Sequence, residues 1–376
     1  MVLTRGTRWG ASFTKLGRHR RVGILIALTL CLTSLLVSSA APVAAGTPPG
    51  GEIILKCAYS HTAQEDPILA PGAQSAHVHD FFGNTGTNAS STYDSLTGMP
   101  NNSTGTTCED THDTAAYWVP ELYFNGAVWH PPGDAVTGYA VRVYYTDFTG
   151  KAVVSVPPDL QMINGFPFAT GPAPNTAVVS YNCGANNGIK TPISRWPYDC
   201  TPYQGLFSGF DGVVARVEFP KCWDGKTVAN GGLPAGSHPK FVPPYVSSNS
   251  VEDVVQPAPG FPCPSDHPLR IPVISIRLHT KIVDPCMAQT PCSPTDSASA
   301  ANVKIGFAQN QGGVSAPGPF WTFHADFWNA WNQNGGDAAN PVPGTLDDLV
   351  LDCLDPSGPN GQKTCGVIRD GHYPTP

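Results

Sequence analysis

The chain has 376 residues, of which only 13% are charged, and its 28 acidic residues outnumber its 21 Lys and Arg. This balance argues against a nucleic-acid partner, which needs a basic surface to neutralise phosphates, and against docking on anionic lipid. The 39 Gly and 39 Pro disfavour long helices, so the composition favours strands joined by long loops.

Residues 1–45 have the pattern of a secretory signal peptide. Six basic residues precede an apolar stretch at 22–37, and small residues follow, with cleavage expected near Ala40 or Ala45. A retained membrane anchor is the alternative, since the apolar run is close to the short limit for a bilayer span. Removal of this segment changes the formal charge from −7 to −13, because it holds six basic and no acidic residues. We therefore expect a secreted protein whose residues 46–376 form a single β-rich domain.

Strand-like runs recur along that domain. Alternation of apolar and polar residues, or short β-branched and aromatic runs, predicts strands at 53–55, 116–123, 140–148, 178–181, 213–219 and 271–279. One helix is expected at 345–352, where Thr345 is a suitable N-cap, and the start of a second is expected at 327–331. The predicted fold is mainly β: a single-domain β-sandwich or jelly-roll-like fold with long disulfide-linked loops and one or two short helices.

Ten cysteines follow the signal segment, and an even count in an exported chain predicts up to five disulfides. Spacing does not determine the connectivity. Local pairs are feasible for Cys286/Cys292, Cys353/Cys365 and Cys183/Cys200. No C-x₂-C spacing occurs, which argues against a zinc–cysteine cluster.

Two histidine motifs define the candidate site. His77 and His79 are one residue apart, so a strand would project both from the same face. His324 and Asp326 form a similar pair near the other end of the chain. We expect His77, His79 and His324 to bind a metal such as zinc or copper, with Asp326 or Asp113 as a carboxylate ligand or a partner of the ligands. Two alternatives remain open: a metal-free polar catalytic site, and histidines that serve only the structure.

Acid–base hydrolysis of a polysaccharide is a second hypothesis. A glycosidase needs two carboxylates at a defined separation, which sequence cannot give, and a histidine near them could orient one or act as an acid. The bland alternative is that these acids occupy turns and helix caps. The candidates are Asp80, Asp110, Asp113, Glu121 and Asp326.

Pure binding of glycans is a third hypothesis. Aromatic residues crowd around His324 and follow the acidic cluster, and exposed rings can stack on sugars. Large aromatics more often fill a core, because they bury so much area. Trp129 and Trp196 are the better surface candidates, since each adjoins Pro or His in an expected loop.

Short motifs follow one another in a fixed order along the chain: Asp66-Pro67-Ile68, His77-Val78-His79, Ala116-Tyr117-Trp118-Val119-Pro120, Met162-Ile163-Asn164-Gly165, Tyr181-Asn182-Cys183, Phe219-Pro220-Lys221-Cys222-Trp223 and Phe323-His324-Ala325-Asp326-Phe327. This series resembles the secreted domain-of-unknown-function family nineteen-ninety-six. The family occurs in filamentous fungi, sometimes fused to carbohydrate-binding cell-wall modules, and in actinobacteria. The resemblance therefore implies secretion and one fold unit, and it brings no established reaction.

These observations together predict an extracellular carbohydrate-active protein, hydrolytic in its action, with a pocket around His77, His79, Asp113 and His324 and with Asp326 beside it. Extracellular polysaccharide or cell wall is the expected partner. The alternative is a non-enzymatic protein that binds cell-wall carbohydrate or a metal.

Overall fold

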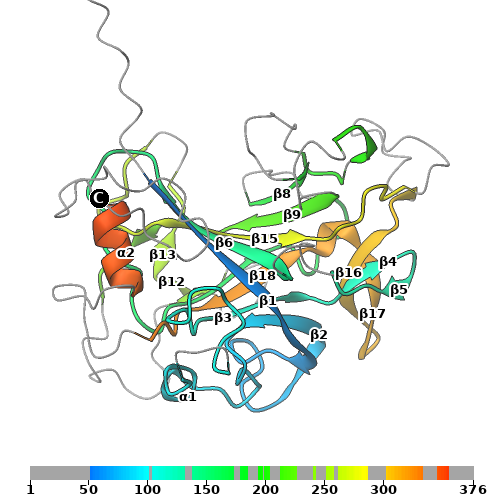
Figure 1. Ribbon diagram of the computed structural model, residues 1–376, viewed down its shortest axis with the longest axis horizontal. Coiled ribbons are helices and arrows are strands. Elements are labelled where there is room, and N and C mark those ends of the chain that lie inside the picture. The colour runs from blue at the N-terminus through cyan, green and yellow to red at the C-terminus, as the bar shows by residue number, and fades with distance from the viewer. Residues whose placement is uncertain are drawn as a thin grey trace, which may run out of the picture. The chain divides into compact units, whose positions relative to one another are not determined.

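The computed structural model describes residues 51–100, 104–131, 138–172, 178–184, 194–197, 199–203, 212–226, 240–242, 251–257, 261–286, 302–332 and 345–354 (Figure 1). All of them belong to one compact unit, Pro48–Pro376. The expected signal segment, Cys292 and Cys365 lie outside these residues. Among the described residues, no helix is long and apolar enough to cross a membrane.

Eleven strands form the principal sheet, in the order β12-β11-β7-β18-β3-β2-β1-β6-β15-β9-β8. Their bounds are β1 Gly51–Glu65, β2 Gln74–Gly83, β3 Ala116–Pro120, β6 Tyr139–Asp147, β7 Gln161–Gly165, β8 Val179–Cys183, β9 Val213–Glu218, β11 Lys240–Val242, β12 Val251–Glu252, β15 Val273–His279 and β18 His324–Trp328.

The long strand β1 divides this sheet into two layers (Figure 1). Its residues 51–58 pair with β6, and its residues 59–65 pair with β2. We call the side from β6 to β8 layer 1 and the side from β2 to β12 layer 2. The two layers pack against each other, since the hydroxyls of Tyr117 in layer 2 and Tyr145 in layer 1 lie 3.0 Å apart. Asn164 of layer 2 donates a 2.7 Å hydrogen bond to the carbonyl of Glu218 in layer 1. The molecule is thus a β-sandwich, as predicted.

Alternation along the strands separates an inner from an outer face in each layer. In layer 2, Phe82, Tyr117 and Phe327 join the core between the layers, whereas Phe81 and Trp118 join a smaller cluster on the outer face. Because strand side chains alternate with period 2, His77 and His79 lie on the outer face with Phe81.

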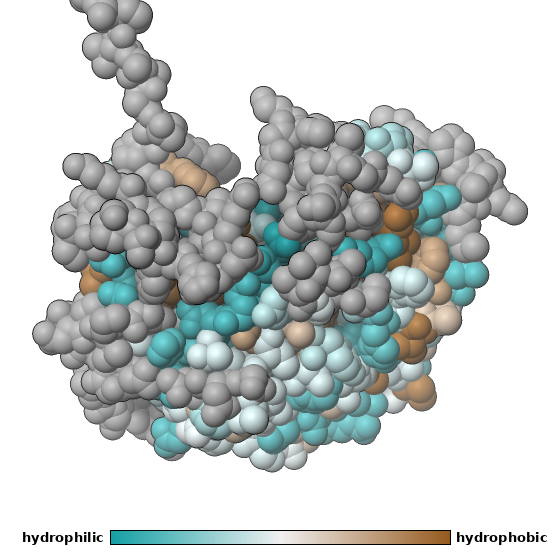
Figure 2. Space-filling view, in the orientation of Figure 1, coloured by the Kyte–Doolittle hydropathy of each residue, from teal (hydrophilic) through white to brown (hydrophobic). Residues whose placement is uncertain are grey.

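The outer face of layer 1 is polar. One basic residue from each of four adjacent strands lies in register there: Lys56, Arg142, Arg277 and Arg216. Figure 2 shows hydrophilic residues in the middle of the face that it presents, over β6 and β15. Hydrophobic residues gather at its right-hand side, over a second sheet that contains the exposed Val128 and Val314.

That second sheet has the order β17-β16-β4-β5, and a third, of three strands, has the order β13-β10-β14. Their strands are β4 Leu122–Phe124, β5 Ala127–Val128, β10 Cys222–Trp223, β13 Val254–Val255, β14 Leu269–Arg270, β16 Ile305–Gln311 and β17 Val314–Pro319. The described helices are α1 Tyr93–Thr97, η1 Thr201–Tyr203, η3 Phe320–Thr322 and α2 Leu346–Cys353.

The predicted strands are all present, and so is the helix predicted at 345–352, which is α2. The helix predicted from Phe327 is wrong. Phe327 and Trp328 are the last two residues of β18, which pairs with β3 on one side and β7 on the other, and residues 329–331 follow the strand without helical structure. The alternating burial of β18 between the core and the outer cluster is a strand pattern that five residues were too few to reveal.

Three disulfides join described cysteines. They are Cys57–Cys108, Cys183–Cys200 and Cys222–Cys263. The local Cys183/Cys200 pair is confirmed, and Cys286 and Cys353 are disulfide-bonded as well. Disulfides of this number are typical of proteins that fold in an oxidising compartment.

Candidate metal centre

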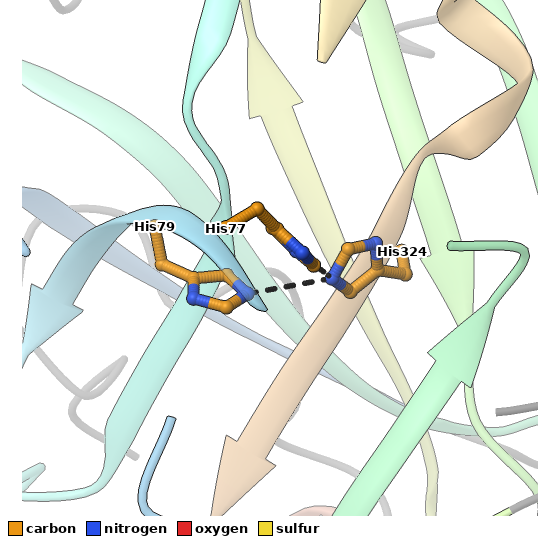
Figure 3. Close-up of side chains that lie close together, drawn as sticks. All are labelled: His77, His79 and His324. Carbon is orange, nitrogen blue, oxygen red and sulfur yellow. Dashed lines mark hydrogen bonds between the residues drawn. The ribbon is translucent and has the colours of Figure 1, made fainter. Parts of the chain in front are cut away.

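Three histidine side chains from two distant segments meet on the outer face of layer 2 (Figure 3). His77 and His79 come from β2, and His324 is the first residue of β18. Strand β3 runs between them: His79 lies opposite Pro120, and the β3–β18 register, continued by two residues, places His324 opposite Pro120 too. The side chains of His79 and His324 therefore approach each other across Pro120.

The Nε2 atoms of the three rings converge. Nε2 of His324 lies 3.2 Å from Nε2 of His77 and 3.4 Å from Nε2 of His79 (Figure 3). A tetrahedral ion with bonds of 2.0–2.1 Å to nitrogen would place its ligand nitrogens about 3.3 Å apart. The two measured separations bracket that value.

Backbone carbonyls fix the protons of two rings. Nδ1 of His79 lies 2.8 Å from the carbonyl oxygen of Glu65, and Nδ1 of His324 lies 3.0 Å from that of Thr322. A carbonyl oxygen only accepts hydrogen bonds, so each Nδ1 carries a proton and, in a neutral ring, each Nε2 presents a lone pair. Two lone pairs that face each other at 3.4 Å cannot form a hydrogen bond. A shared cation satisfies both, and a carbonyl on Nδ1 is the usual outer partner of a metal-bound histidine.

Burial keeps these rings neutral. It lowers the pKa of His77 to about 4. The pKa of His324 falls to about 3, mainly through burial and then through the neighbouring His77. The pKa of His79, which is fully buried, lies well below its ordinary value for the same reasons. Neutral imidazole is the form that binds metal.

Asp326 places a carboxyl group close to one of the converging nitrogens. Its Oδ2 lies 3.9 Å from Nε2 of His324, and the residue is fully buried. Neither carboxylate oxygen has a hydrogen-bond partner within the described part of the chain. Burial, and then the charge of Asp66, raises the pKa of Asp326 well above its usual range. A buried, unsatisfied carboxyl group beside the neutral ring of His324 can serve as a further ligand or as a partner for a bound molecule.

Gly165 allows β18 to approach β7 at the histidine. It pairs with His324, and its φ of +112° is a conformation that favours glycine. A Cβ atom at this position would lie 2.4 Å from the Cα of His324. The sequence motif that contains Gly165 was part of the family resemblance, but nothing in it indicated this close approach.

A pocket of about 140 Å³ opens beside the cluster and contains His77 and His324 in its lining. The chain between β1 and β2 contributes Asp66, Leu69 and Ala70, and the chain after β7 contributes Pro167 and Phe168. Leu69 and Phe168 are 41% and 53% exposed, so they stand at the rim. Sequence reasoning missed these lining residues, because their only shared feature is that the fold brings two loops together.

Asp113 does not lie with the histidines. The Tyr117 hydroxyl donates to both of its oxygens, at 3.0 and 3.1 Å, and Tyr117 belongs to the core between the layers. Its carboxylate lies beside the Cys57–Cys108 disulfide instead. Burial raises the pKa of Asp113 well above the usual range, with the Tyr117 hydrogen bond opposing it. The structure thus assigns Asp113 to the interior, away from the predicted pocket.

The other three carboxylates predicted as candidates, Asp80, Glu121 and Asp110, also lie elsewhere. Asp80 alternates with His79 and so projects from the other face of β2, where it accepts a hydrogen bond from Thr62. Glu121 accepts one from the Tyr123 hydroxyl at 2.6 Å. Asp110 accepts from the backbone N–H of His112. Each therefore has a local structural partner.

The aromatic residues around His324 fill the core, as the bland alternative held. Phe320, Phe323, Phe327 and Trp331 are at most 2% exposed. The prediction that Trp196 and Trp129 lie on the surface is wrong. Trp196 is buried in the core, and Trp129 is partly buried and packs against that core.

The fold and the cluster define a disulfide-bonded β-sandwich protein with a buried three-histidine site. The chain belongs to DUF1996, a family described as a domain of unknown function, whose model matches residues 66–331. The matched region contains all three histidines and Asp326. No curated protein and no solved structure matches the chain.

Proposed function

We propose that this protein is a secreted metalloprotein that binds one zinc or copper ion through His77, His79 and His324. The observation that carries the proposal is the meeting of the Nε2 atoms at 3.2 and 3.4 Å, with the Nδ1 protons of two rings held by backbone carbonyls. Secretion is supported by the N-terminal signal pattern and by the disulfides.

The proposed activity is hydrolysis, with extracellular polysaccharide or cell wall as the target. Three histidine ligands are the number found in catalytic zinc sites, which keep a position open for water or substrate. A bound ion would supply Lewis acidity at that position. The chain itself orients His79 and His324, excludes bulk water from the histidines and holds Asp326 within 3.9 Å of Nε2 of His324, where it can hold or take up a proton.

The test of metal binding is elemental analysis of the purified mature protein before and after dialysis against a chelator and reloading with zinc or copper. We expect one ion per chain in the parent and a loss of stoichiometric binding in His77→Ala. His130→Ala is the matched control, because the His130 side chain is 46% exposed and lies away from the cluster, beside Asp80. No ion in the reloaded parent, or equal loss in both variants, would refute the proposal.

The second candidate is metal or cell-wall binding without turnover. It is favoured by the burial of the histidines, which are at most 6% exposed. A digestion screen against cell-wall polysaccharides, run beside a glycan array, separates the candidates. Glycan binding without released product supports binding alone, whereas product that disappears in His77→Ala supports catalysis.

A further inference from the structure

The pocket beside the three histidines restricts what can react there. From its size and lining we infer that the centre accepts a short acyl group, so that its substrate is an ester or amide of a small carboxylic acid carried on an extracellular polysaccharide. This inference rests on the proposed function and names its substrate class.

The first argument is volume. Pockets that hold drug-sized ligands measure about 300–1,000 Å³, and a cavity of about 150 Å³ holds benzene. The pocket here measures about 140 Å³. A sugar ring with its neighbours in a polymer is too large for it. A side group on the polymer fits, and the polymer itself would remain outside.

The second argument is polarity. Apolar side chains, including Leu69, Ile163, Pro167 and Phe168, form the larger part of the walls, and Asp66, Ser75 and the two histidines form the polar part. Buried sugar hydroxyls need hydrogen-bond partners, and their transfer to apolar surroundings without them is costly. An acetyl methyl group has no such requirement and is favoured by the same walls.

The third argument is the position of the polar groups. The pocket lining includes His77 and His324, whose Nε2 atoms point into the cluster, and Asp326 follows His324 on the same face. A short acyl group among the apolar side chains would place its carbonyl carbon next to these nitrogens. The scissile bond then lies where the proposed ion would act.

The reaction is an ordinary hydrolysis. The oxygen of a water molecule bonds to the acyl carbon, and the bond from that carbon to the alcohol oxygen or amine nitrogen breaks. The leaving atom takes a proton, and the products are the short acid and the deacylated polysaccharide. No oxidant or reductant is needed.

Phe168 and Leu69 are the specificity residues in this arrangement. They stand at the rim and limit the length of the chain that can enter. Phe168→Ala should widen the entrance without a large effect on folding, since this ring is 53% exposed. Phe148→Ala is the matched control: Phe148 is 59% exposed and does not line the pocket.

The experiment uses the zinc-loaded mature protein with acetyl, butyryl and octanoyl esters of p-nitrophenol, and then acetylated xylan and chitin oligomers. We expect kcat/KM to be at least about tenfold higher for the acetyl than for the octanoyl ester. Phe168→Ala should reduce this ratio at least about threefold, and Phe148→Ala should leave it unchanged. Release of acetate from xylan or from chitin identifies the natural bond as ester or amide.

A binding measurement keeps the inference independent of turnover. Acetohydroxamic and octanohydroxamic acids can be titrated into the zinc-loaded protein. The short-chain acid should bind more tightly than the long-chain acid, and Phe168→Ala should reduce this difference in affinity. Equal or stronger binding of the long chain, or hydrolysis of glycosidic bonds with no deacylation, would overturn the inference. Those results would contradict the inferred substrate class but not metal binding, whereas absence of stoichiometric zinc would refute the proposed function itself.

Discussion

Zinc binding at pH 6.0 should release far fewer protons than three histidines normally would. At an ordinary pKa near 6.5, three imidazoles would together carry about 2.3 protons at this pH, all of which a metal must displace. In the metal-free protein the pKa of His77 is about 4 and that of His324 about 3. Each ring then carries about 0.01 proton or less. With His79 also neutral, the three ligands release almost nothing.

Asp326 adds at most one proton. Burial raises its pKa well above the usual range, which favours the protonated form in the metal-free protein. An adjacent cation would favour its ionised form. We therefore expect about one proton released per zinc in the parent and about none in Asp326→Asn.

The assay is isothermal titration calorimetry in two buffers of different ionisation enthalpy at pH 6.0. The difference between the observed enthalpies gives the number of protons released. Release of two or more protons per zinc would show that the rings are not held neutral, and the reasoning from burial would fail. The same number in the parent and in Asp326→Asn would remove Asp326 from the site.

Three further predictions concern stability. Gly165→Ala places a Cβ atom 2.4 Å from the Cα of His324 at a φ of +112°, so we expect a loss of about 2 kcal/mol or more in urea unfolding, together with weaker zinc binding. Tyr117→Phe removes the hydroxyl that donates to Asp113, which should cost about 1–3 kcal/mol in the same assay. In the metal-free protein, the contribution of His77 to stability should be lost as the pH falls from 6.5 to 4. The unfolded chain binds a proton at His77 in this window and the folded chain does not, a difference of about 3 kcal/mol.

Controls separate these effects from general damage. Gly126→Ala also changes a glycine of positive φ, but no atom lies within 4 Å of its added Cβ, so it should retain zinc binding. If Gly165→Ala were no weaker than Gly126→Ala in zinc binding, the close approach would be irrelevant. Tyr117→Phe should be less stable than the parent but should bind the same amount of metal, since Asp113 is not a ligand. His77→Phe should reduce the loss of stability on acidification without abolishing it, because His79 and His324 still titrate, and an unchanged slope would exclude a contribution from His77.

Local pattern was enough to predict the histidine pair. Alternation along a single strand places His77 and His79 on one side whatever the sheet does around them. The β-rich fold class could also be predicted from the sequence, because frequent short apolar runs and abundant Gly and Pro favour strands over helices. The helix at 345–352 could be predicted from an N-cap and acidic first turn.

Placement of the carboxylates could not be predicted. Asp113 is near the histidines in the order of motifs. The face of layer 2 on which its side chain lies, however, depends on the register of the following strand β3 and on which face of layer 2 meets layer 1. A shift of one residue in register moves a side chain to the other face. The division of β1 between the two layers and the approach of the two loops that form the pocket likewise depend on contacts between distant segments, which no local pattern encodes.

The separation of the ligands along the chain has a consequence for maturation. His77 and His324 are 247 residues apart, and β3 must lie between their strands before the rings can meet. Under the proposed function the unfolded polypeptide offers no complete binding site, so the ion is acquired only when the sheet is complete. The supply of metals in the compartment where folding finishes, rather than in the compartment of synthesis, then decides which element the protein carries.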